Sequence, residues 1–392
     1  MKRILLASAA LAMLTTAASA EVKIGVILGY TGPIESLTPD MASGAELAIK
    51  EVSDSGALLG GEKVVSIRGD TTCTDAAAAT TATERLVTSD RVNAIVGGDC
   101  SGVTTAMLQN VAKPNGVVMI SPSATSPALS TIEDNGLFFR TSPSDARQGQ
   151  VLTDILKEKG IKQVAMTYTN NDYGKGLAES IRTNFEKAGG KVTISAAHED
   201  GKGDYSAEVA ALAAAGGEVL VVAGYLDQGG KGVIQASLDT GAFETFVLPD
   251  GMIGDSLPKA IGADLNGSFG TVPGTDSPGA AKFADMAKAA GFKAGPFSSE
   301  SYDAAALILL AMQAAGSSDS AKLKDKVMMV ANAPGEKIFP GELAKALKIL
   351  AGGGDIDYVG ATAVELIGPG ESAGNYREIL VKDGKNTTAK FR

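Results

Sequence analysis

The chain has 392 residues and a formal net charge of −10, from 45 acidic and 35 basic side chains. This balance argues against a nucleic acid or an anionic membrane as partner, because both are negatively charged themselves. Apolar residues make up 44 % of the sequence, which is ample for folding, and the length predicts two domains rather than one.

The N-terminus has the pattern of a secretory signal. Lys2 and Arg3 precede an apolar run over residues 4–14, and Ala18-Ser19-Ala20 supplies a small-residue cleavage site. The run is shorter than the about 20 residues that a membrane helix needs. We therefore predict a signal peptide at 1–20, cleavage near Ala20 and export to a bacterial periplasm. A buried N-terminal helix is the alternative.

Strands and helices then alternate along the chain, which predicts parallel sheets covered by helices. The first run has expected strands at 22–28, 64–68, 92–96, 116–120 and 138–141, and expected helices at 40–52, 75–87 and 101–111. Asp40 and Ser101 are the expected caps of two of these helices. The second run has expected helices at 144–159, 176–188, 205–214 and 230–238, and expected strands at 163–168, 191–196, 219–223 and 245–248.

The last part of the chain is expected to complete these two units. It contains expected helices at 280–290, 299–315 and 340–350 and a strand at 378–381, too few for a third domain. The fold class is therefore α/β, with two doubly wound parallel-sheet lobes. Segments that cross back between the lobes suit a hinge.

The two cysteines, Cys73 and Cys100, are both at expected strand ends. In an oxidising compartment a lone pair is most simply a disulfide. A redox pair is the alternative, but it favours close spacing such as C-x-x-C.

Two apolar strands end in loops of small and hydroxyl residues, at 97–101 and 120–125. Strand ends that face helix N-termini are where open α/β sheets bind ligands, and backbone N–H groups with hydroxyls suit a carboxylate. These loops contain no nucleophile paired with a base. They favour capture of a small anion or zwitterion over catalysis.

Patterns for several kinds of chemistry are missing. Residues 25–32 have the wrong spacing for a dinucleotide-binding loop, and residues 98–102 are not a nucleophile elbow. The single histidine, His198, is in a charged segment and is predicted to be a solvated loop side chain. We expect no enzymatic activity, no metal and no cofactor.

Short motifs along the whole mature chain carry a family resemblance. In order, they are Ile24-Gly25-Val26, Thr31-Gly32-Pro33, Cys73, Cys100-Ser101, Ile120-Ser121-Pro122-Ser123-Ala124-Thr125, Phe139-Arg140-Thr141, Asp172-Tyr173-Gly174-Lys175-Gly176 and Gly224-Tyr225. Each is weak alone, but their joint order is specific. The sequence resembles the type I periplasmic binding proteins of ABC transporters, and among them the receptors for leucine, isoleucine and valine.

The resemblance implies two lobes joined by three crossings, with the ligand closed between them. The expected N-terminal lobe is 21–142 with 274–370, and the expected C-terminal lobe is 143–273 with 371–392. The implied function is to bind an amino acid, aliphatic or branched, and deliver it to an ABC permease. The implied state is a monomer.

The resemblance also assigns roles in the site. Ser101 would bind the ligand carboxylate, and Thr125 would contact both the carboxylate and the ammonium. Ser123 would accept from the ammonium through its carbonyl, and Ala124 lies between them in the same loop. Asp250 would pair with the ammonium. Tyr173 and Tyr225 would close over the ligand from the second lobe.

Bland alternatives stay open for these residues. Ser101 could be only a helix cap, and Thr125 and Asp250 could be only turn residues. The two tyrosines could be rim packing.

Two departures from the family leave the ligand open. The family has a Trp where this chain has about Leu37, and a Glu where it has Asp250. Glu300, near Phe297, is a further acid expected near the cleft. Polar, basic or γ-amino acids such as GABA, amides or carboxylates are alternative ligands. A sensor that presents its closed form to a chemoreceptor or kinase is the alternative role, and an enzyme on the same fold is a third interpretation.

Overall fold

Short apolar strands build the first of two seven-stranded sheets, in the order β13-β14-β5-β4-β3-β1-β2. The computed structural model describes residues 21–392, so the expected signal peptide lies outside the described residues. The strands are β1 (Glu21–Leu28), β2 (Lys63–Asp70), β3 (Ala94–Gly97), β4 (Val118–Ser121), β5 (Phe138–Pro143), β13 (Leu366–Ile367) and β14 (Glu371–Ser372). All pairs are parallel except β13 with β14. Strands β3, β4 and β5 are buried along their whole length, as in sheets covered on both faces.

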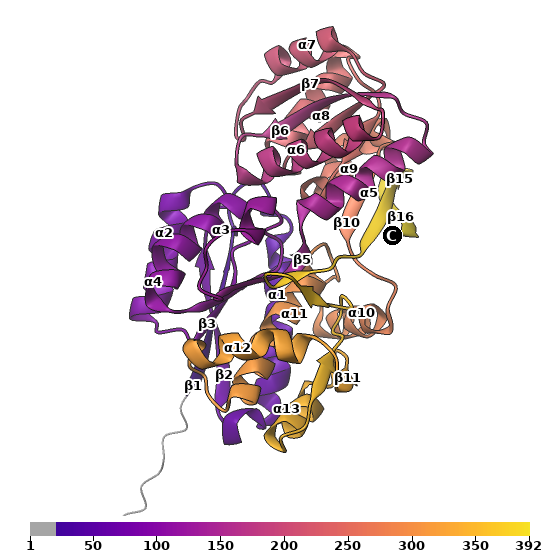
Figure 1. The fold of residues 1–392 in the computed structure, drawn as a ribbon. Coiled ribbons are helices and arrows are strands. Elements are labelled where there is room, and N and C mark those ends of the chain that lie inside the picture. The colour runs from indigo at the N-terminus through magenta and orange to yellow at the C-terminus, as the bar shows by residue number, and fades with distance from the viewer. Residues whose placement is uncertain (1–20) are drawn as a thin grey trace, which may run out of the picture.

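Helices cover both faces of this sheet (Figure 1). They are α1 (Thr38–Ser55), α2 (Ala76–Glu84), α3 (Ser101–Met107), α4 (Lys113–Asn115), α10 (Pro278–Ala290), α11 (Ser298–Ala315), α12 (Ser320–Ala331) and α13 (Leu343–Ala351). Helix α11 is the most deeply buried of them and packs along α1 and α12. A small parallel pair, β11 (Glu336–Ile338) with β12 (Ile356–Tyr358), lies beside these helices.

The second sheet has the order β16-β15-β10-β9-β8-β6-β7. Its strands are β6 (Gln163–Thr169), β7 (Lys191–His198), β8 (Val219–Ala223), β9 (Phe246–Leu248), β10 (Phe269–Pro273), β15 (Tyr376–Lys382) and β16 (Lys385–Phe391). Its helices are α5 (Asp145–Glu158), α6 (Asp172–Lys187), α7 (Ser206–Ala215), α8 (Gly229–Thr240) and α9 (Ser256–Ile261). The hairpin β15–β16 runs antiparallel along the edge next to β10.

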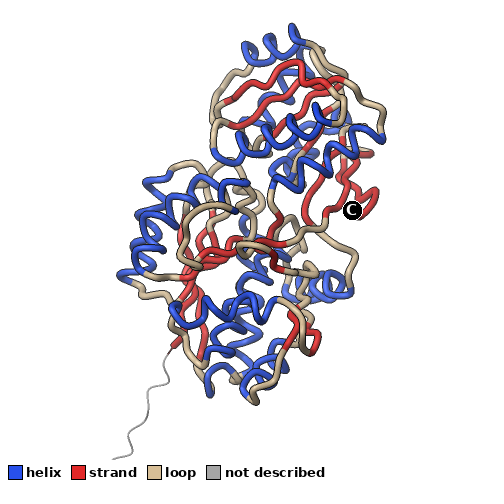
Figure 2. The backbone as a smooth tube through the Cα atoms, viewed as in Figure 1, coloured by secondary structure: helices blue, strands red, loops and turns tan. Residues whose placement is uncertain are grey.

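The chain changes sheet three times: between β5 and α5, between β10 and α10, and between β14 and β15. Figure 2 shows the two sheets as separate red layers. The predicted fold class, two doubly wound lobes joined by three crossings, is confirmed. We propose the lobe division 21–142 with 274–372 and 143–273 with 373–392. The last boundary moves from the expected residue 370 because Glu371 and Ser372 pair with β5 of the first sheet.

Several local predictions were wrong. Helix α1 begins at Thr38, so Asp40 is not its cap but an acid in its first turn, where Pro39 is also tolerated. Ser101 is not the cap of α3 but its first residue, and Cys100 is in the cap position. The helix expected over 101–111 is α3 followed by a π-helical turn at Leu108–Ala112. Helix α12, the β11–β12 pair and strand β16 were not predicted.

Among residues 21–392, none of the helices combines the length and the apolar character needed to cross a bilayer.

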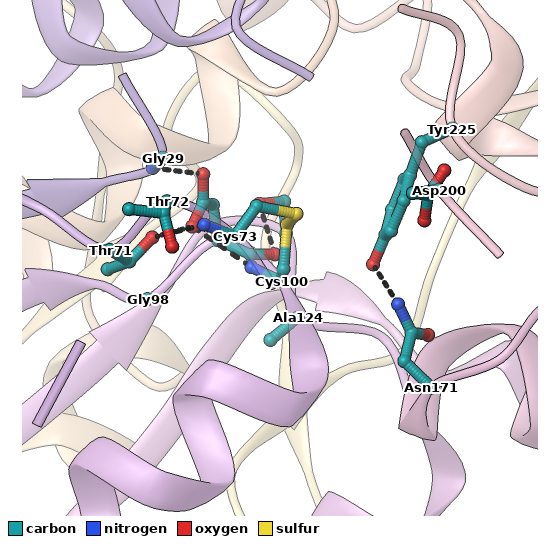
Figure 3. Close-up of a disulfide and its surroundings, with 12 residues drawn as sticks. Gly29, Thr71, Thr72, Cys73, Gly98, Cys100, Ala124, Asn171, Asp200 and Tyr225 are labelled. Atoms are coloured by element: carbon teal, nitrogen blue, oxygen red, sulfur yellow. Dashed lines mark hydrogen bonds between the residues drawn. A yellow bond between two sulfur atoms is a disulfide. The ribbon is translucent and has the colours of Figure 1, made fainter. Parts of the chain in front are cut away.

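The predicted disulfide is present between Cys73 and Cys100, whose Cα atoms are 5.2 Å apart (Figure 3). Cys73 follows β2 and Cys100 follows β3, and both side chains are buried. The bridge therefore ties together two loops at the same end of the first sheet.

Replacing both cysteines by alanine should lower the free energy of unfolding of the first lobe by about 3–4 kcal/mol, from the chain entropy that the bridge removes from the unfolded state. The measurement is denaturant unfolding of the oxidised wild type and the variant, with the reduced wild type as control. The reduced wild type should match the variant. A variant as stable as the oxidised protein would contradict the estimate.

Candidate functional site

A cavity of about 320 Å³ lies between the two lobes. It is lined by Ile34, Leu37, Asp99, Cys100, Ser101, Ser123, Tyr173, Tyr225, Asp250, Gly251 and Phe297. The first lobe therefore supplies hydroxyls, apolar side chains and the Asp99 carboxylate, while the second supplies two tyrosines and the Asp250 carboxylate.

Most of the predicted site residues are brought together in this cavity. Leu37, Ser101, Ser123, Tyr173, Tyr225 and Asp250 all line it. Ala124 and Thr125 do not line it but are buried in the loop that follows Ser123. Their roles toward a ligand stay predictions.

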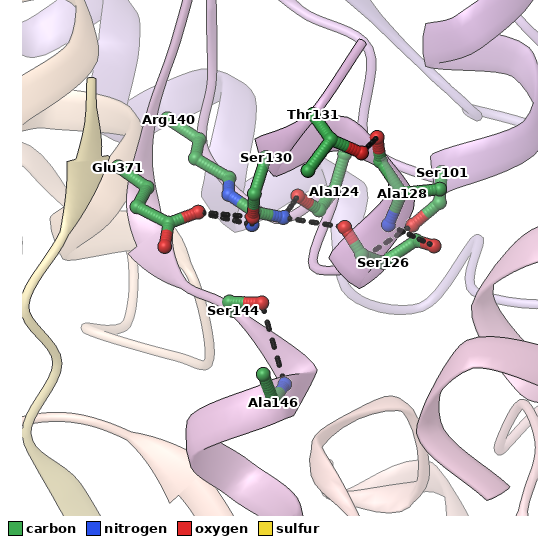
Figure 4. Close-up of polar contacts among 10 residues, drawn as sticks. All are labelled: Ser101, Ala124, Ser126, Ala128, Ser130, Thr131, Arg140, Ser144, Ala146 and Glu371. Atoms are coloured by element: carbon green, nitrogen blue, oxygen red, sulfur yellow. Dashed lines mark hydrogen bonds and ion pairs between the residues drawn. The ribbon is translucent and has the colours of Figure 1, made fainter. Parts of the chain in front are cut away.

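Ser101 has the geometry of a hydroxyl donor. It is the first residue of α3, and its Oγ accepts a hydrogen bond from the Ser126 N–H at 3.1 Å (Figure 4). Because that bond uses a lone pair, the hydroxyl proton of Ser101 is left for another acceptor. Ser123 on the neighbouring loop uses its own hydroxyl differently, donating to the Asp99 carbonyl at 3.0 Å.

Asp99, directly before the disulfide residue Cys100, joins three loop ends. Its carboxylate accepts from the Gly29 N–H at 2.6 Å, from the Thr71 hydroxyl at 3.1 Å and from the Cys100 N–H at 3.1 Å. Burial raises the pKa of Asp99, and these hydrogen bonds oppose the rise. The wall that carries Ser101 is thereby fixed by both a covalent and a polar link.

Arg140 holds the loop that contains Ala124 and Thr125 (Figure 4). Its buried guanidinium donates to the carbonyls of Ala124 and Ser126 at 3.0 and 2.9 Å. It also donates to the Ser130 hydroxyl at 2.7 Å and to Glu371 at 2.5 Å. Buried carbonyls need such donors, so Arg140 is a positioning residue for this loop.

The second wall is built around Asp250. Its Oδ1 accepts from the Tyr173 hydroxyl at 2.7 Å and from the Gly251 N–H at 2.8 Å. With its amide oriented to suit both neighbours, Gln148 also donates to this oxygen, at 3.2 Å. Burial raises the pKa of Asp250 to about 6, against these hydrogen bonds.

The two tyrosines form one stacked unit on this wall. The rings of Tyr173 and Tyr225 have centroids 5.1 Å apart and planes 16° from parallel. The Tyr225 hydroxyl accepts from the Asn171 side chain at 3.5 Å (Figure 3). Both tyrosines are buried, so this face offers the cavity flat aromatic surface with few free polar atoms.

Asp145 is the residue that sequence reasoning missed. It is fully buried, and neither carboxylate oxygen has a hydrogen-bond partner among residues 21–392. Burial, and next the charge of Asp250, raise its pKa well above the ordinary value, and the charge of Arg140 and the nearby Thr125 hydroxyl oppose the rise without forming a hydrogen bond of normal geometry. In sequence it follows the helix cap Ser144, so it looked like an ordinary acid in a first helical turn.

Nearby hydroxyls share this lack of partners. The Thr125 Oγ1 and the Tyr376 hydroxyl are buried without a hydrogen bond among residues 21–392. The electrostatic influence of Asp145 and Asp250 reaches Tyr376, which places these groups in one region. Unpaired buried polar groups are costly, so this region is arranged to receive further donors.

The prediction for His198 was wrong. The residue is the last of β7 and is buried, with its Nδ1 2.8 Å from the Thr167 hydroxyl. Two glycines leave room for the ring, since a Cβ at Gly224 or Gly229 would come within 3.0 or 2.8 Å of it. Burial lowers the pKa of His198 to about 4, so the ring is neutral at pH 7.

Glu300 does not line the cavity, although Phe297 three residues before it does. Its carbonyl accepts from the Thr141 hydroxyl at 2.8 Å, and its side chain is buried. Burial raises the pKa of its carboxyl to about 8, with Arg377 as the cation that opposes the rise. Within residues 21–392, no cluster of three or more His, Cys, Asp and Glu could hold a metal ion.

Comparison with known proteins now places the chain. A model of the periplasmic binding protein family matches residues 21–338. The chain belongs to this family. Its members are substrate-binding receptors, and membership implies export to the periplasm.

Relatives and solved structures agree. The Leu/Ile/Val-binding protein homolog 3 of Brucella melitensis is 31 % identical over 323 residues, covering 80 % of this chain and 84 % of that protein. The amino acid binding protein of Pseudomonas aeruginosa is 30 % identical, covering 79 % and 83 %. A leucine binding protein from Thermotoga maritima superposes with a TM-score of 0.80 at 23 % identity, covering 94 % and 98 %.

The buried carboxylates predict how stability depends on pH. The folded state holds the Asp250 proton to about pH 6, whereas the unfolded chain releases it near pH 4. The free energy of unfolding of the ligand-free protein should therefore fall as pH rises from about 4 to about 6. Asp303, whose pKa burial also raises to about 6, contributes in the same interval.

Asp250→Asn should make this fall shallower, because it removes one of the titrating groups. The measurement is denaturant unfolding at several pH values between about 4 and 7. Asp264→Asn, at an exposed position on the same lobe, is the matched control. Equal pH dependence in wild type and Asp250→Asn would show that Asp250 does not titrate in this interval.

Proposed function

We propose that this protein is a periplasmic receptor that binds an amino acid between its lobes and delivers it to an ABC permease. The observation that carries the proposal is a cavity between the lobes with the Ser101 hydroxyl left to donate on one wall and the buried Asp250 carboxylate on the other, close to the buried Asp145. A zwitterion supplies the missing charge of each sign. Relatives named as binding proteins for leucine, isoleucine, valine or amino acids support the same ligand class.

The ammonium of the ligand would be held at the second wall. Asp250 lines the cavity, and Asp145 lies close enough for their charges to interact. An ammonium leaving water needs a charged partner, and a carboxylate leaving water needs a cation, so each removes the cost of burying the other. The partnerless Thr125 hydroxyl and the Ser123 carbonyl are proposed as further acceptors.

The carboxylate of the ligand would be held at the first wall. The Ser101 hydroxyl is free to donate, and the backbone N–H of Thr125 is the second proposed donor. Arg140 and the Asp99 network keep these loops in place before ligand arrives, which lowers the ordering cost of binding.

The side chain of the ligand would meet an apolar wall. Ile34, Leu37 and Phe297 line the cavity together with the disulfide at Cys100. Leu37 is aliphatic where the resembled receptors place a Trp. This lining supports an aliphatic, branched side chain.

Contacts between the lobes describe the closed form. The Asp227 N–H donates to the Pro33 carbonyl at 3.0 Å, and the Ser36 N–H donates to the Asp227 carboxylate at 2.9 Å. We propose that ligand contacts to both lobes stabilise this form and that the three crossings act as the hinge. The permease would recognise the closed form.

The remaining assignments are proposals of the same kind. They are cleavage near Ala20, a monomeric state and the absence of catalysis. The alternative role is a sensor for another small amino acid, amide or carboxylate such as GABA. A permease gene and an ATPase gene next to this one would favour transport, and turnover of a bound amino acid would exclude a simple receptor.

Asp250→Ala should weaken amino acid binding at least about tenfold, because the buried ammonium loses a charged partner. The measurement is isothermal titration of refolded, ligand-stripped protein with leucine, isoleucine and valine, then with GABA and short amides and carboxylates. Asp264→Ala is the control. Unchanged affinity would place the ammonium elsewhere, and binding of only a non-α-amino ligand would overturn the proposed pocket.

Asp145→Asn keeps the shape of the side chain and removes its charge. If Asp145 shares the ammonium with Asp250, this variant should also bind leucine about tenfold more weakly. The same titration measures it, with the thermal midpoint as a check on folding. Affinity within about twofold of wild type would show that Asp145 does not pair with the ammonium and acts only as an acid in the first turn of α5.

A further inference from the structure

A second hollow, distinct from the cavity described above, lies between the lobes on the side of the β15–β16 hairpin. We call it the hairpin groove. It is lined by the start of α1, the segments 253–259 and 293–296, and the β15–β16 hairpin, and its volume is about 1210 Å³ with the space at its mouth. Residues from both lobes therefore meet around it, as they do around the cavity.

Arg377 is the unusual residue of the hairpin groove. It is on β15, directly after the third crossing, and is partly buried. Its stem lies against Gly274 of the second crossing, where a Cβ would come within 2.8 Å of the Arg377 Nε. Among residues 21–392 its guanidinium forms no ion pair and donates no hydrogen bond, and burial lowers its pKa.

Glu300 is the acid that faces Arg377, but it does not neutralise it. The two side chains interact through their charges without forming an ion pair. Because burial raises the pKa of Glu300 to about 8, its carboxyl is mainly protonated at pH 7. A partly buried guanidinium on the wall of the groove is thus left without a protein counterion, and an anion that enters the groove meets an unpaired cation.

The charges around the hairpin groove favour binding of an anion with a single negative charge. Arg377, Lys259 and Lys293 line it against Asp40 and Asp255, in a chain whose net charge is −10. Lys293 pairs with Asp255 at 2.6 Å, and both side chains are well exposed. The two aspartates would repel a doubly charged anion such as phosphate, whereas a carboxylate matches the planar fork of one guanidinium.

We propose that the hairpin groove is a carboxylate-binding subsite with Arg377 as its principal cation. The carboxylate has two possible sources, a separate small carboxylate or the distal end of an elongated amino acid bound in the cavity. The second source rests on the proposed function. Leu37 lines both hollows and packs on Gly254, where a Cβ would come within 2.9 Å of the Leu37 Cδ2, so its side chain is the partition between them.

The test titrates ¹³C-acetate, followed by its NMR line width, into full-length mature protein with L-leucine present in excess. The wild type should bind acetate, and Arg377→Met should lose at least about tenfold in affinity. Arg377→Lys should retain part of the binding, because it keeps the charge without the fork. Arg182→Met, at an exposed arginine on α6, is the matched control and should bind acetate like the wild type.

Two further titrations distinguish the two sources of the carboxylate. They also distinguish failure of the subsite from failure of the proposed function. If L-2-aminoadipate binds at least about tenfold more weakly to Arg377→Met while L-leucine is unaffected, the ligand carries the carboxylate. If Arg377→Met weakens the binding of acetate but not of L-2-aminoadipate, the carboxylate comes from a separate small molecule. If no amino acid binds but acetate still depends on Arg377, the proposed function fails and the subsite stands. Acetate binding that is absent from the wild type, or equal in Arg377→Met, would overturn the subsite when all variants keep their thermal midpoints.

Discussion

Two carboxylates buried close together, Asp145 and Asp250, are the constraint on which the rest of this site depends. Asp250 is hydrogen-bonded only through one oxygen, and Asp145 has no partner among the described residues. In the folded, ligand-free chain the cheapest way to bury them is to keep protons, which is why burial raises both pKa values. An ammonium removes the need for those protons. On the proposed function, ligand binding and the ionisation of the site are therefore one coupled event.

The first wall meets the opposite requirement, because it must present donors without collapsing onto them. The Arg140 guanidinium donates to the carbonyls of Ala124 and Ser126, and the Asp99 carboxylate accepts from the N–H groups of Gly29 and Cys100. The disulfide holds the loops after β2 and β3 at one distance. The Ser101 hydroxyl proton is left unused on this wall, and the rigidity of the neighbouring loops keeps this donor available.

Sequence patterns were informative where local chemistry and tertiary structure agree. Alternating apolar strands and helices predicted two covered parallel sheets, and the spacing of Cys73 and Cys100 in an exported chain predicted their bridge. The loops after β3 and β4 were identified because small and hydroxyl residues at strand ends have few other uses. Their neighbour Asp250 came from the family resemblance alone.

The failures come from burial that no local pattern records. Asp145 has the sequence surroundings of a helix start, and only the packing of α5 under the second sheet removes it from water. His198 is in a charged segment, but the glycines at 224 and 229, far along the chain, open the space that buries its ring. Strand β16 consists mostly of exposed polar residues, so its pattern is that of a loop, and pairing with β15 defines it.

The contacts that close the lobes are individually weak, and this decides what can hold the closed form. The Lys293–Asp255 pair has side chains 76 % and 70 % exposed, and exposed pairs contribute about 0–1 kcal/mol. The Ser36–Asp227 hydrogen bond is also at the surface. Such contacts can define how the two lobes are positioned in the closed form. They are too weak to offset the entropy lost when the lobes become fixed relative to one another. The decisive energy must come from groups buried only on closure. Asp250 lines the ligand cavity, and the buried polar groups of Asp145, Thr125 and Tyr376 lie in the same region without hydrogen bonds among residues 21–392, so on the proposed function a ligand there supplies that energy.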